Sequence, residues 1–348
     1  NRYHPVCDFL NALQWDGTER IRFCLHHFLG SDTDDYTYEA LKLFLLGAIS
    51  RAFKPGCKFE VMLCLVGGQG AGKSSFFRLL AVNDDWFSDD LKKLDDENVY
   101  RKMQGHWIIE MSEMIATANA KSIEEIKSFL SRQKETYKIP YETHPADRKR
   151  QCVFGGSSNT LDFLPLDRTG NRRFVPVMVY PERAEVHILA DEQASREYIN
   201  QMWAEAMEIY RSGNFRLRFS PAMNDYLKAH QKDFMPEDTK AGQILDYLER
   251  YSGSIVCSKQ LYKEALGHDY DEPKQWELRE INDIMNNAVT GWRAFSNPRY
   301  FPEPYRRQKG WERIRNDNEP DNSMDGFQEI PTEEMEQLGL PEEWLKQK

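Results

Sequence analysis

The sequence predicts an α/β fold whose core is a mostly parallel sheet around a phosphate-binding loop (P-loop). Short apolar runs suited to buried strands alternate with segments that show helical periodicity. A glycine-rich segment, 67–74, directly follows the first apolar run, 61–66, and a helical pattern follows it in turn. This order of strand, loop and helix is the context in which phosphate-binding loops occur.

The pattern changes along the chain predict four regions. Residues 1–55 have helical periodicity, and residues 56–220 hold the strands and the glycine-rich segment. Residues 241–315 show helices followed by a short hairpin, which suggests a small winged-helix-like domain. Residues 316–348 form an acidic tail that we expect to be flexible, because it is rich in charge and contains several prolines.

Composition indicates a globular protein of a reducing compartment. The 348 residues are 40% hydrophobic and 29% charged, and no apolar run approaches the roughly 20 residues that cross a bilayer. The six cysteines are scattered, without a zinc-site spacing, which favours the cytoplasm. The net charge of −10 lies mostly in the tail, which has ten acids and two bases, so basic patches on the body stay possible. We expect no membrane partner.

The strongest motif is the segment from Gly67 to Ser74, which matches G-x-x-x-x-G-K-[ST]. Glycines let the backbone curl so that successive N–H groups point at phosphates, and the following helix adds its positive dipole end. Lys73 would reach the β and γ phosphates of ATP, and the Ser74 hydroxyl would bind Mg²⁺. The residues expected to hold the nucleotide are Gly67, Gly68, Gln69, Gly70, Ala71, Gly72, Lys73, Ser74 and Ser75.

Two glutamates follow the second apolar run, 107–109. Glu110 and Glu113 are candidates for holding the Mg²⁺ shell and for polarising the attacking water. The sequence leaves open which glutamate does which. The alternative is that one of them is only a solvated acid near a helix start.

Polar residues near the third and fourth apolar runs complete the expected site. Asn159 follows the third run and is placed to contact the γ-phosphate or orient water, although asparagine after glycines also marks turns. Arg172 and Arg173 precede the fourth run, and arginine suits the charge of a transferring phosphoryl group. A surface ion pair is the alternative for these arginines.

Residues 132–150 are basic and contain interleaved aromatic side chains, and they read as two polar strands around a turn. Bases with aromatics on a hairpin suit single-stranded DNA, through phosphate contacts and base stacking. An ordinary solvated hairpin is the alternative. The candidate DNA-binding residues are Lys134, Tyr137, Lys138, Tyr141, Arg148, Lys149 and Arg150.

These motifs in this order resemble the virulence-associated protein E family of phages and mobile elements. The resemblance covers roughly residues 4–220, with a weaker match over 242–311. Its motifs are His4-Pro5, Trp15-Asp16-Gly17, Pro55-Gly56-Cys57-Lys58, the glycine-rich segment, Pro140-Tyr141-Glu142 and Thr169-Gly170-Asn171-Arg172-Arg173-Phe174. The family is similar to superfamily 3 helicases, which are hexameric AAA+ motors.

The resemblance implies an AAA+-like core with named roles. Lys73 and Ser74 fall in Walker A, Glu110 and Glu113 in the Walker B region, and Asn159 at the sensor position. Arg172 and Arg173 are candidates for a finger that reaches the ATP of a neighbouring subunit. The segment 134–150 lies where such helicases carry a DNA-binding hairpin. Glu110 departs from the aspartate common in P-loop enzymes, which alters geometry more than function.

The sequence thus predicts an ATP-dependent replicative DNA helicase that moves on single-stranded DNA as a homo-oligomeric ring, a hexamer by resemblance, in a bacterial cytoplasm. The chain begins at Asn1 and not at Met, so we expect a fragment, with a primase region or partner N-terminal to it. One alternative is an AAA+ switch that assembles on nucleic acid without unwinding. The other is a P-loop small-molecule kinase.

Overall fold

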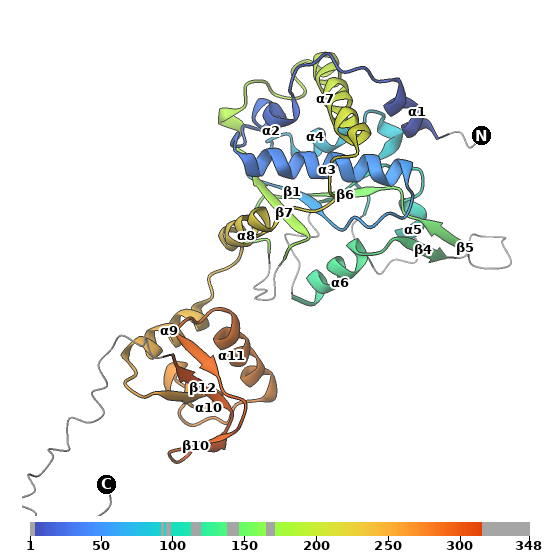
Figure 1. Cartoon of the computed structure of the whole chain (residues 1–348). Helices are drawn as coiled ribbons and strands as arrows, with labels where there is room; N and C mark the ends of the chain where they lie inside the picture. The colour runs from blue at the N-terminus through green and yellow to red at the C-terminus, as the bar shows by residue number, and fades with distance from the viewer. Residues whose placement is uncertain are drawn as a thin grey trace, which may run out of the picture. The chain divides into compact units, whose positions relative to one another are not determined.

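The computed structural model divides into two compact units, residues 1–238 and 239–348. The first unit holds α1 to α8 and the second begins with α9 (Figure 1). The residues that the structure describes are 4–91, 94, 99–112, 120–137, 146–164 and 171–314.

The larger unit is built on a five-stranded sheet in the order β2-β3-β6-β1-β7, and every pairing in it is parallel. Its strands are β1 (Met62–Val66), β2 (Phe87–Ser88), β3 (Ile108–Ser112), β6 (Val153–Ser158) and β7 (Phe174–Met178). All five residues of the central strand β1 are buried. Burial on both faces explains why this strand is continuously apolar instead of alternating.

Successive residues of β1 supply two separate cores, one on each face of the sheet. Leu63 and Leu65 join the core beneath the helices of the first face, whereas Cys64 and Val66 join the core of the second. The first face carries α1 (Pro5–Ala12), α2 (Ile21–Leu29), α3 (Asp35–Phe53), α4 (Lys73–Leu80) and α7 (Glu192–Ser212). The second carries α5 (Val99–Lys102) and α6 (Ala120–Leu130), with α6 drawn beyond the sheet from α3 in Figure 1.

Local sequence explains where the long helices begin and how closely they pack. Asp34 accepts a hydrogen bond from Thr37 N (2.8 Å) at the start of α3, and Asp191 accepts one from Ala194 N (3.0 Å) at the start of α7. Helix α4 lies against β6 because residue 155 is glycine: a Cβ there would come within 2.4 Å of the Phe77 ring.

The remaining elements of the larger unit are short. An antiparallel hairpin joins β4 and β5 beside the sheet, and α8 is the last α-helix of the unit. The bounds are η1 (Asp84–Trp86), β4 (Lys134–Tyr137), β5 (Ala146–Lys149), η2 (Pro181–Arg183), α8 (Pro221–His230) and η3 (Gln231–Phe234).

The smaller unit packs helices on a three-stranded antiparallel sheet of order β8-β12-β9, and a separate hairpin pairs β10 with β11. Its core includes Ile244, Leu261, Ile284 and Trp311. The elements are α9 (Thr239–Arg250), β8 (Ile255–Cys257), α10 (Ser258–Gln260), η4 (Leu261–Ala265), α11 (Gln275–Asn287), β9 (Trp292–Ala294), β10 (Arg299–Phe301), β11 (Arg306–Gln308) and β12 (Gly310–Arg313).

The mixed α/β class and the parallel sheet are confirmed. The winged-helix assignment and the bounds of the four predicted regions stay predictions. Helices α1 to α3 share a core with the first face of the sheet, so they belong to the same compact unit. Among the described residues, no helix has both the length and the apolar character to cross a membrane.

Candidate active site

The candidate site lies where β1, β3 and β6 end. Because these strands run parallel, the residues that follow them meet at one edge of the sheet. The segment 67–72 leaves β1 there and leads directly into α4, as the sequence predicts.

Glycines are required in this loop for two different reasons. At residue 67 a Cβ would come within 2.5 Å of the Val179 carbonyl oxygen, so only glycine lets the chain leave β1 so close to the neighbouring strand. At residues 70 and 72 the backbone has φ of +82° and +79°, which favours glycine. The crest of the loop, residues 68–70, is exposed.

Lys73 is turned back into the loop. Its Nζ donates to the carbonyl oxygens of Gly67 and Gly68, both at 2.7 Å, and to Asn159 Oδ1 at 2.9 Å. Two residues that the sequence singled out separately, Lys73 and Asn159, are therefore in direct contact. Burial lowers the pKa of the Lys73 ammonium, and the carboxylate of Glu110 opposes that shift.

Glu110 lies within β3 and is fully buried. Its Oε1 accepts hydrogen bonds from the hydroxyls of Ser74 (2.7 Å) and Ser157 (2.5 Å). Its Oε2 is also buried and has no hydrogen-bond partner among the described residues. Burial raises the pKa of Glu110, while the bonds from Ser157 and Ser74 lower it.

Buried polar atoms in proteins nearly always have a partner, so the lone Oε2 of Glu110 is an exception that needs an explanation. The Ser74 hydroxyl lies beside this carboxylate, so the atoms that could bind a metal here are oxygens, and Mg²⁺ prefers oxygen ligands. Within the part of the chain that is described, no cluster of three His, Cys, Asp or Glu side chains exists that would hold a metal by itself. A cation here would need further oxygen ligands from a bound substrate or water.

Comparison with known proteins assigns the chain to a family. The model of the virulence-associated protein E-like domain matches residues 10–236. The chain belongs to this family. A search of curated proteins found no match.

Solved structures of the NrS-1 C-terminal region also align with this VapE-like chain. The apo structure of residues 305–718 shares 12% identity at a TM-score of 0.49, covering 88% of this chain and 78% of the other. An apo structure described as the A form shares 13% identity at the same TM-score of 0.49 and the same coverage.

The VapE-like chain does not bring all the predicted catalytic residues together. Arg172 and Arg173 precede β7, whose first residue pairs with Met62 at the start of β1, so they lie at the opposite end of the sheet from the loop. There they pair with Glu60, at 3.0 Å for Arg172 and 3.5 Å for Arg173. Glu113 lies outside the described residues.

Sequence reasoning missed Ser157, which faces the site from β6 and binds Glu110. The available signal was its position in the run 155–159 at the end of a predicted strand. In a parallel sheet, residues in the same register on adjacent strands lie side by side, and Ser157 is in register with Ser112. Glu110 lies two residues before Ser112, so the two side chains share one face of β3, and this face brings Ser157 near Glu110.

The predicted hairpin is present, and its strands β4 and β5 pair antiparallel from Lys134↔Lys149 to Tyr137↔Ala146. Lys134 forms an ion pair with Asp147, and Thr136 donates to the same carboxylate at 2.6 Å. Arg148 and Lys149 are exposed. Lys138 and Tyr141 lie outside the described residues, as does the side chain of Tyr137.

Arg150 differs from the prediction that it binds DNA, because its side chain is buried. It forms an ion pair with buried Glu135 and donates to the Phe129 carbonyl oxygen at 2.7 Å. Its guanidinium also lies 4.6 Å from the Phe129 ring centroid and 5.1 Å from that of Phe154. The residue therefore anchors the base of the hairpin to the second core of the unit.

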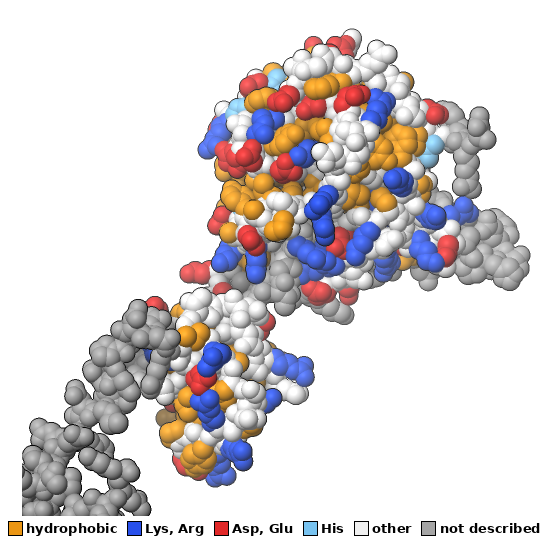
Figure 2. Space-filling model, in the orientation of Figure 1, with side chains coloured by type: hydrophobic (Ala, Val, Ile, Leu, Met, Phe, Trp, Pro, Cys, Tyr) orange, Lys and Arg blue, Asp and Glu red, His pale blue; other side chains and the backbone are white. Residues whose placement is uncertain are grey.

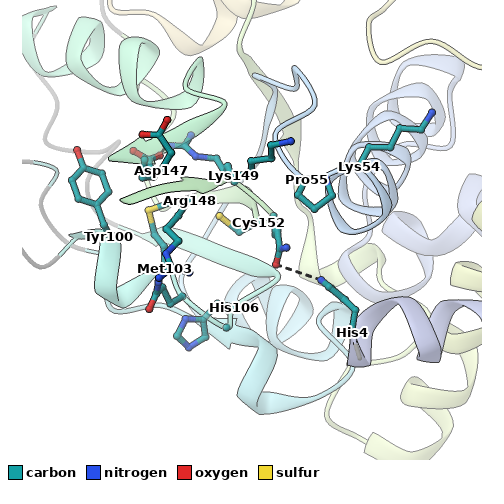
Figure 3. A pocket seen from close by; sticks show the side chains of 15 residues that line it. His4, Lys54, Pro55, Tyr100, Met103, His106, Asp147, Arg148, Lys149 and Cys152 are labelled. Atoms are coloured by element: carbon teal, nitrogen blue, oxygen red, sulfur yellow. Dashed lines mark hydrogen bonds and ion pairs between the residues drawn. The ribbon is translucent and has the colours of Figure 1, made fainter. Parts of the chain in front are cut away.

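A hollow of about 1090 Å³ opens at the base of the hairpin (Figure 3). Its lining includes Lys54 from the end of α3, Tyr100 from α5, and Arg148 and Lys149 from β5. Lys54 and Lys149 have no carboxylate partner among the described residues, whereas the lining acids Asp147 and Glu135 are engaged in ion pairs. Figure 2 shows blue side chains in the region where Figure 1 draws β5. The hollow is therefore suited to an anionic ligand.

Proposed function

We propose that this VapE-like chain is an ATP-driven DNA helicase of phage or mobile-element replication, with a P-loop at residues 67–74. Convergence of Lys73, Ser74, Glu110 and Asn159 at one sheet edge supports it. These residues come from three strand ends that are distant in sequence. A glycine-rich turn without function would not need a buried lysine and a buried carboxylate beside it.

In this proposal Mg²⁺ is the cofactor, and it neutralises charge on the phosphate oxygens when bound with ATP. Ser74 Oγ and Glu110 Oε2 are the atoms that would hold its shell. Glu110 is favoured over Glu113 for this role because it already bonds the Ser74 hydroxyl. Glu113 is then the candidate for polarising the attacking water.

The other site residues have positioning roles. Backbone N–H groups of residues 68–73 and the start of α4 would bind the phosphates. The Lys73 ammonium would contact the β and γ phosphates, and Asn159, which holds that ammonium at 2.9 Å, would orient it or the water. Ser157 supports the Glu110 carboxylate from β6, by donating to the same oxygen that Ser74 binds.

The arginines act on a neighbouring subunit in this proposal. Arg172 and Arg173 are a strand length from the loop of their own chain, and β7 is an edge strand. Arg172 is 68% exposed at the side chain despite its contact with Glu60. An arginine at an exposed sheet edge is available to complete another subunit's site, which is the arrangement of a head-to-tail ring.

The β4–β5 hairpin and the hollow at its base supply the surface for single-stranded DNA. Arg148, Lys149 and Lys54 are the described bases proposed to contact phosphates there.

One observation carries the proposal: the buried carboxylate of Glu110 is bonded to Ser74 of the loop, and its other oxygen has no hydrogen-bond partner in the described part of the chain. The test is displacement of a labelled strand from a forked DNA in the presence of ATP and Mg²⁺. A helicase releases the strand, and Lys73→Ala does not. ATP hydrolysis without displacement would favour a switch, and hydrolysis indifferent to DNA but dependent on a small phosphate acceptor would favour a kinase.

A further inference from the structure

Within residues 239–314 of the smaller unit, the positive charge is concentrated in the segment 291–314, which precedes the acidic tail. Residues 291–314 contain six Lys or Arg and two acids, whereas residues 239–290 contain nine acids and six bases. Figure 2 shows several Lys and Arg side chains exposed on this unit. The segment 291–314 therefore carries a net charge of +4, against −3 for residues 239–290.

The two acids of this segment are already engaged. Glu312 pairs with Arg293 and with Arg299, both at 2.8 Å. Glu303 pairs with Arg306 at 3.3 Å. Glu303 balances Arg306, whereas Glu312 is shared by two arginines and leaves one positive charge unneutralised.

The other three bases of the segment have no carboxylate partner among the described residues, and one of them, Arg313, donates to the carbonyl oxygens of Leu248 and Tyr251. Arg307 donates only to the Pro298 carbonyl oxygen, at 3.4 Å, and Lys309 is exposed. Unneutralised cations at a hairpin end attract anionic ligands.

The register of the β10–β11 hairpin places an aromatic ring beside one of these free cations. Tyr300 is directly opposite Arg307, and Phe301 is opposite Arg306. Phe301 is 1% exposed and packs inward, whereas Tyr300 is 69% exposed. Because successive strand residues face opposite sides, Tyr300 and Arg307 share the outer face of the hairpin.

We propose that this outer face of β10–β11 is a second binding surface for single-stranded nucleic acid. Arg307 and Lys309 contact phosphates, and the Tyr300 ring stacks on an unpaired base. An exposed ring beside cations favours unpaired bases, since the bases of a duplex are already stacked on each other.

The neighbouring helix α11 does not compete for this role. It contains three acids, Glu277, Glu280 and Asp283, against the single base Arg279, so a phosphate backbone would be repelled from it. The hairpin, and not this helix, is the nucleic-acid surface of the smaller unit. The proposal goes beyond the ATPase site and the β4–β5 hairpin of the larger unit, since none of these residues belongs to either.

The experiment measures binding of a fluorescein-labelled oligothymidylate to the full chain by anisotropy, without nucleotide. We expect Tyr300→Ala with Arg307→Ala to weaken binding about tenfold and to reduce the salt slope by about one. Tyr300→Phe keeps the ring and should bind like the wild type. The matched control is Trp276→Ala with Arg279→Ala, which removes the same kinds of exposed side chain from α11.

An unchanged affinity in the hairpin variant, with unchanged thermal unfolding, would overturn the proposal. So would equal losses in the hairpin variant and the α11 control, or a loss in Tyr300→Phe as large as in the hairpin variant. Weakened binding in a Lys54→Ala, Lys149→Ala chain together with normal binding in the β10–β11 variant would support the proposed function and overturn this second surface.

Discussion

Glu110 is the residue on which the candidate site depends most. Its carboxylate is fully buried, yet only one oxygen has hydrogen-bond partners among the described residues. Burial of a charge without full compensation lowers stability, and here it raises the pKa of the group. Such a cost is expected where binding of a cation restores the balance.

This arrangement predicts that Glu110→Gln stabilises the nucleotide-free chain while abolishing Mg²⁺-dependent ATP hydrolysis. Between the unfolded pKa and the raised folded pKa, the folded chain binds more protons, so wild-type stability falls as pH rises through that window. Because glutamine does not ionise, the variant does not lose stability over this pH window. Thermal unfolding over a pH series should show a higher Tm for the variant at neutral pH, with the difference shrinking as pH falls through the window.

Glu205→Gln is the matched control. Glu205 is also buried with a raised pKa, but it accepts hydrogen bonds from the N–H groups of Arg20 (2.6 Å) and Ile21 (2.9 Å), away from the loop. Its substitution should leave hydrolysis intact. Normal hydrolysis by Glu110→Gln would make Glu110 a purely structural residue.

Glu113→Gln tests the complementary role that we propose for the second glutamate. Glutamine keeps the shape of the side chain and loses the charge that polarises water, so we expect normal ATP binding and very slow turnover. Binding of a fluorescent ATP analogue and single-turnover hydrolysis measure the two steps. If Glu110→Gln alone binds without turnover, the two roles are reversed.

At the scale of elements, the hairpin shows how adjacent basic residues differ in role. Lys149 is exposed at the hollow, whereas Arg150 is buried against Glu135 and two phenylalanine rings. The sequence offers both residues equally as DNA ligands. The two residues differ only in packing. The position at which the chain leaves β5 and meets the core decides which of the two side chains is buried.

We therefore expect Arg150→Met to lower the free energy of unfolding by about 3–5 kcal/mol, since it leaves Glu135 buried and unpaired. Urea unfolding measures the loss, and adding Glu135→Leu should recover most of it. Lys149→Met should change stability by about 0.5 kcal/mol or less while weakening DNA binding. Equal stability of the Arg150 and Lys149 variants would contradict the assigned anchor.

Much of the core was predictable because each element has a strong local signal. The apolar run of β1, the glycines after it and the helix α4 are all fixed by short-range patterns. Strand β2 was missed because it has only two residues, Phe87 and Ser88, both half-buried. Contacts such as Ser157 with Glu110 depend on strand order, which no local pattern contains.

At the scale of the whole chain, strand direction separates two sets of predicted catalytic residues. Residues that follow β1, β3 and β6 gather at the end of the sheet where its parallel strands terminate. Residues that precede β7 lie at the opposite end, where the strands begin. Arg172 and Arg173 therefore belong with a site on another copy if they act on ATP. This separation could have been predicted from the sequence, since both arginines come before their strand.

The subunit arrangement predicts that two inactive variants rescue each other. Arg172→Ala with Arg173→Ala keeps an intact loop, and Lys73→Ala keeps intact arginines. Each alone should be nearly inactive, because a finger supplied across an interface accelerates phosphoryl transfer by about 10³–10⁵-fold. Mixing them should restore partial ATP turnover at concentrations where both assemble. No recovery would mean that the arginines act in their own chain or have no part in hydrolysis.

The central claim is that the edge of the sheet around Lys73 and Glu110 hydrolyses ATP. The most direct measurement is ATP turnover by the purified chain with Mg²⁺, with and without single-stranded DNA. Lys73→Ala is compared with Lys42→Ala, which removes a lysine from the surface of α3 instead. The proposal predicts turnover that rises with single-stranded DNA, persists in Lys42→Ala and vanishes in a folded Lys73→Ala chain. Full turnover by folded Lys73→Ala, or none by the wild type with or without DNA, would contradict it.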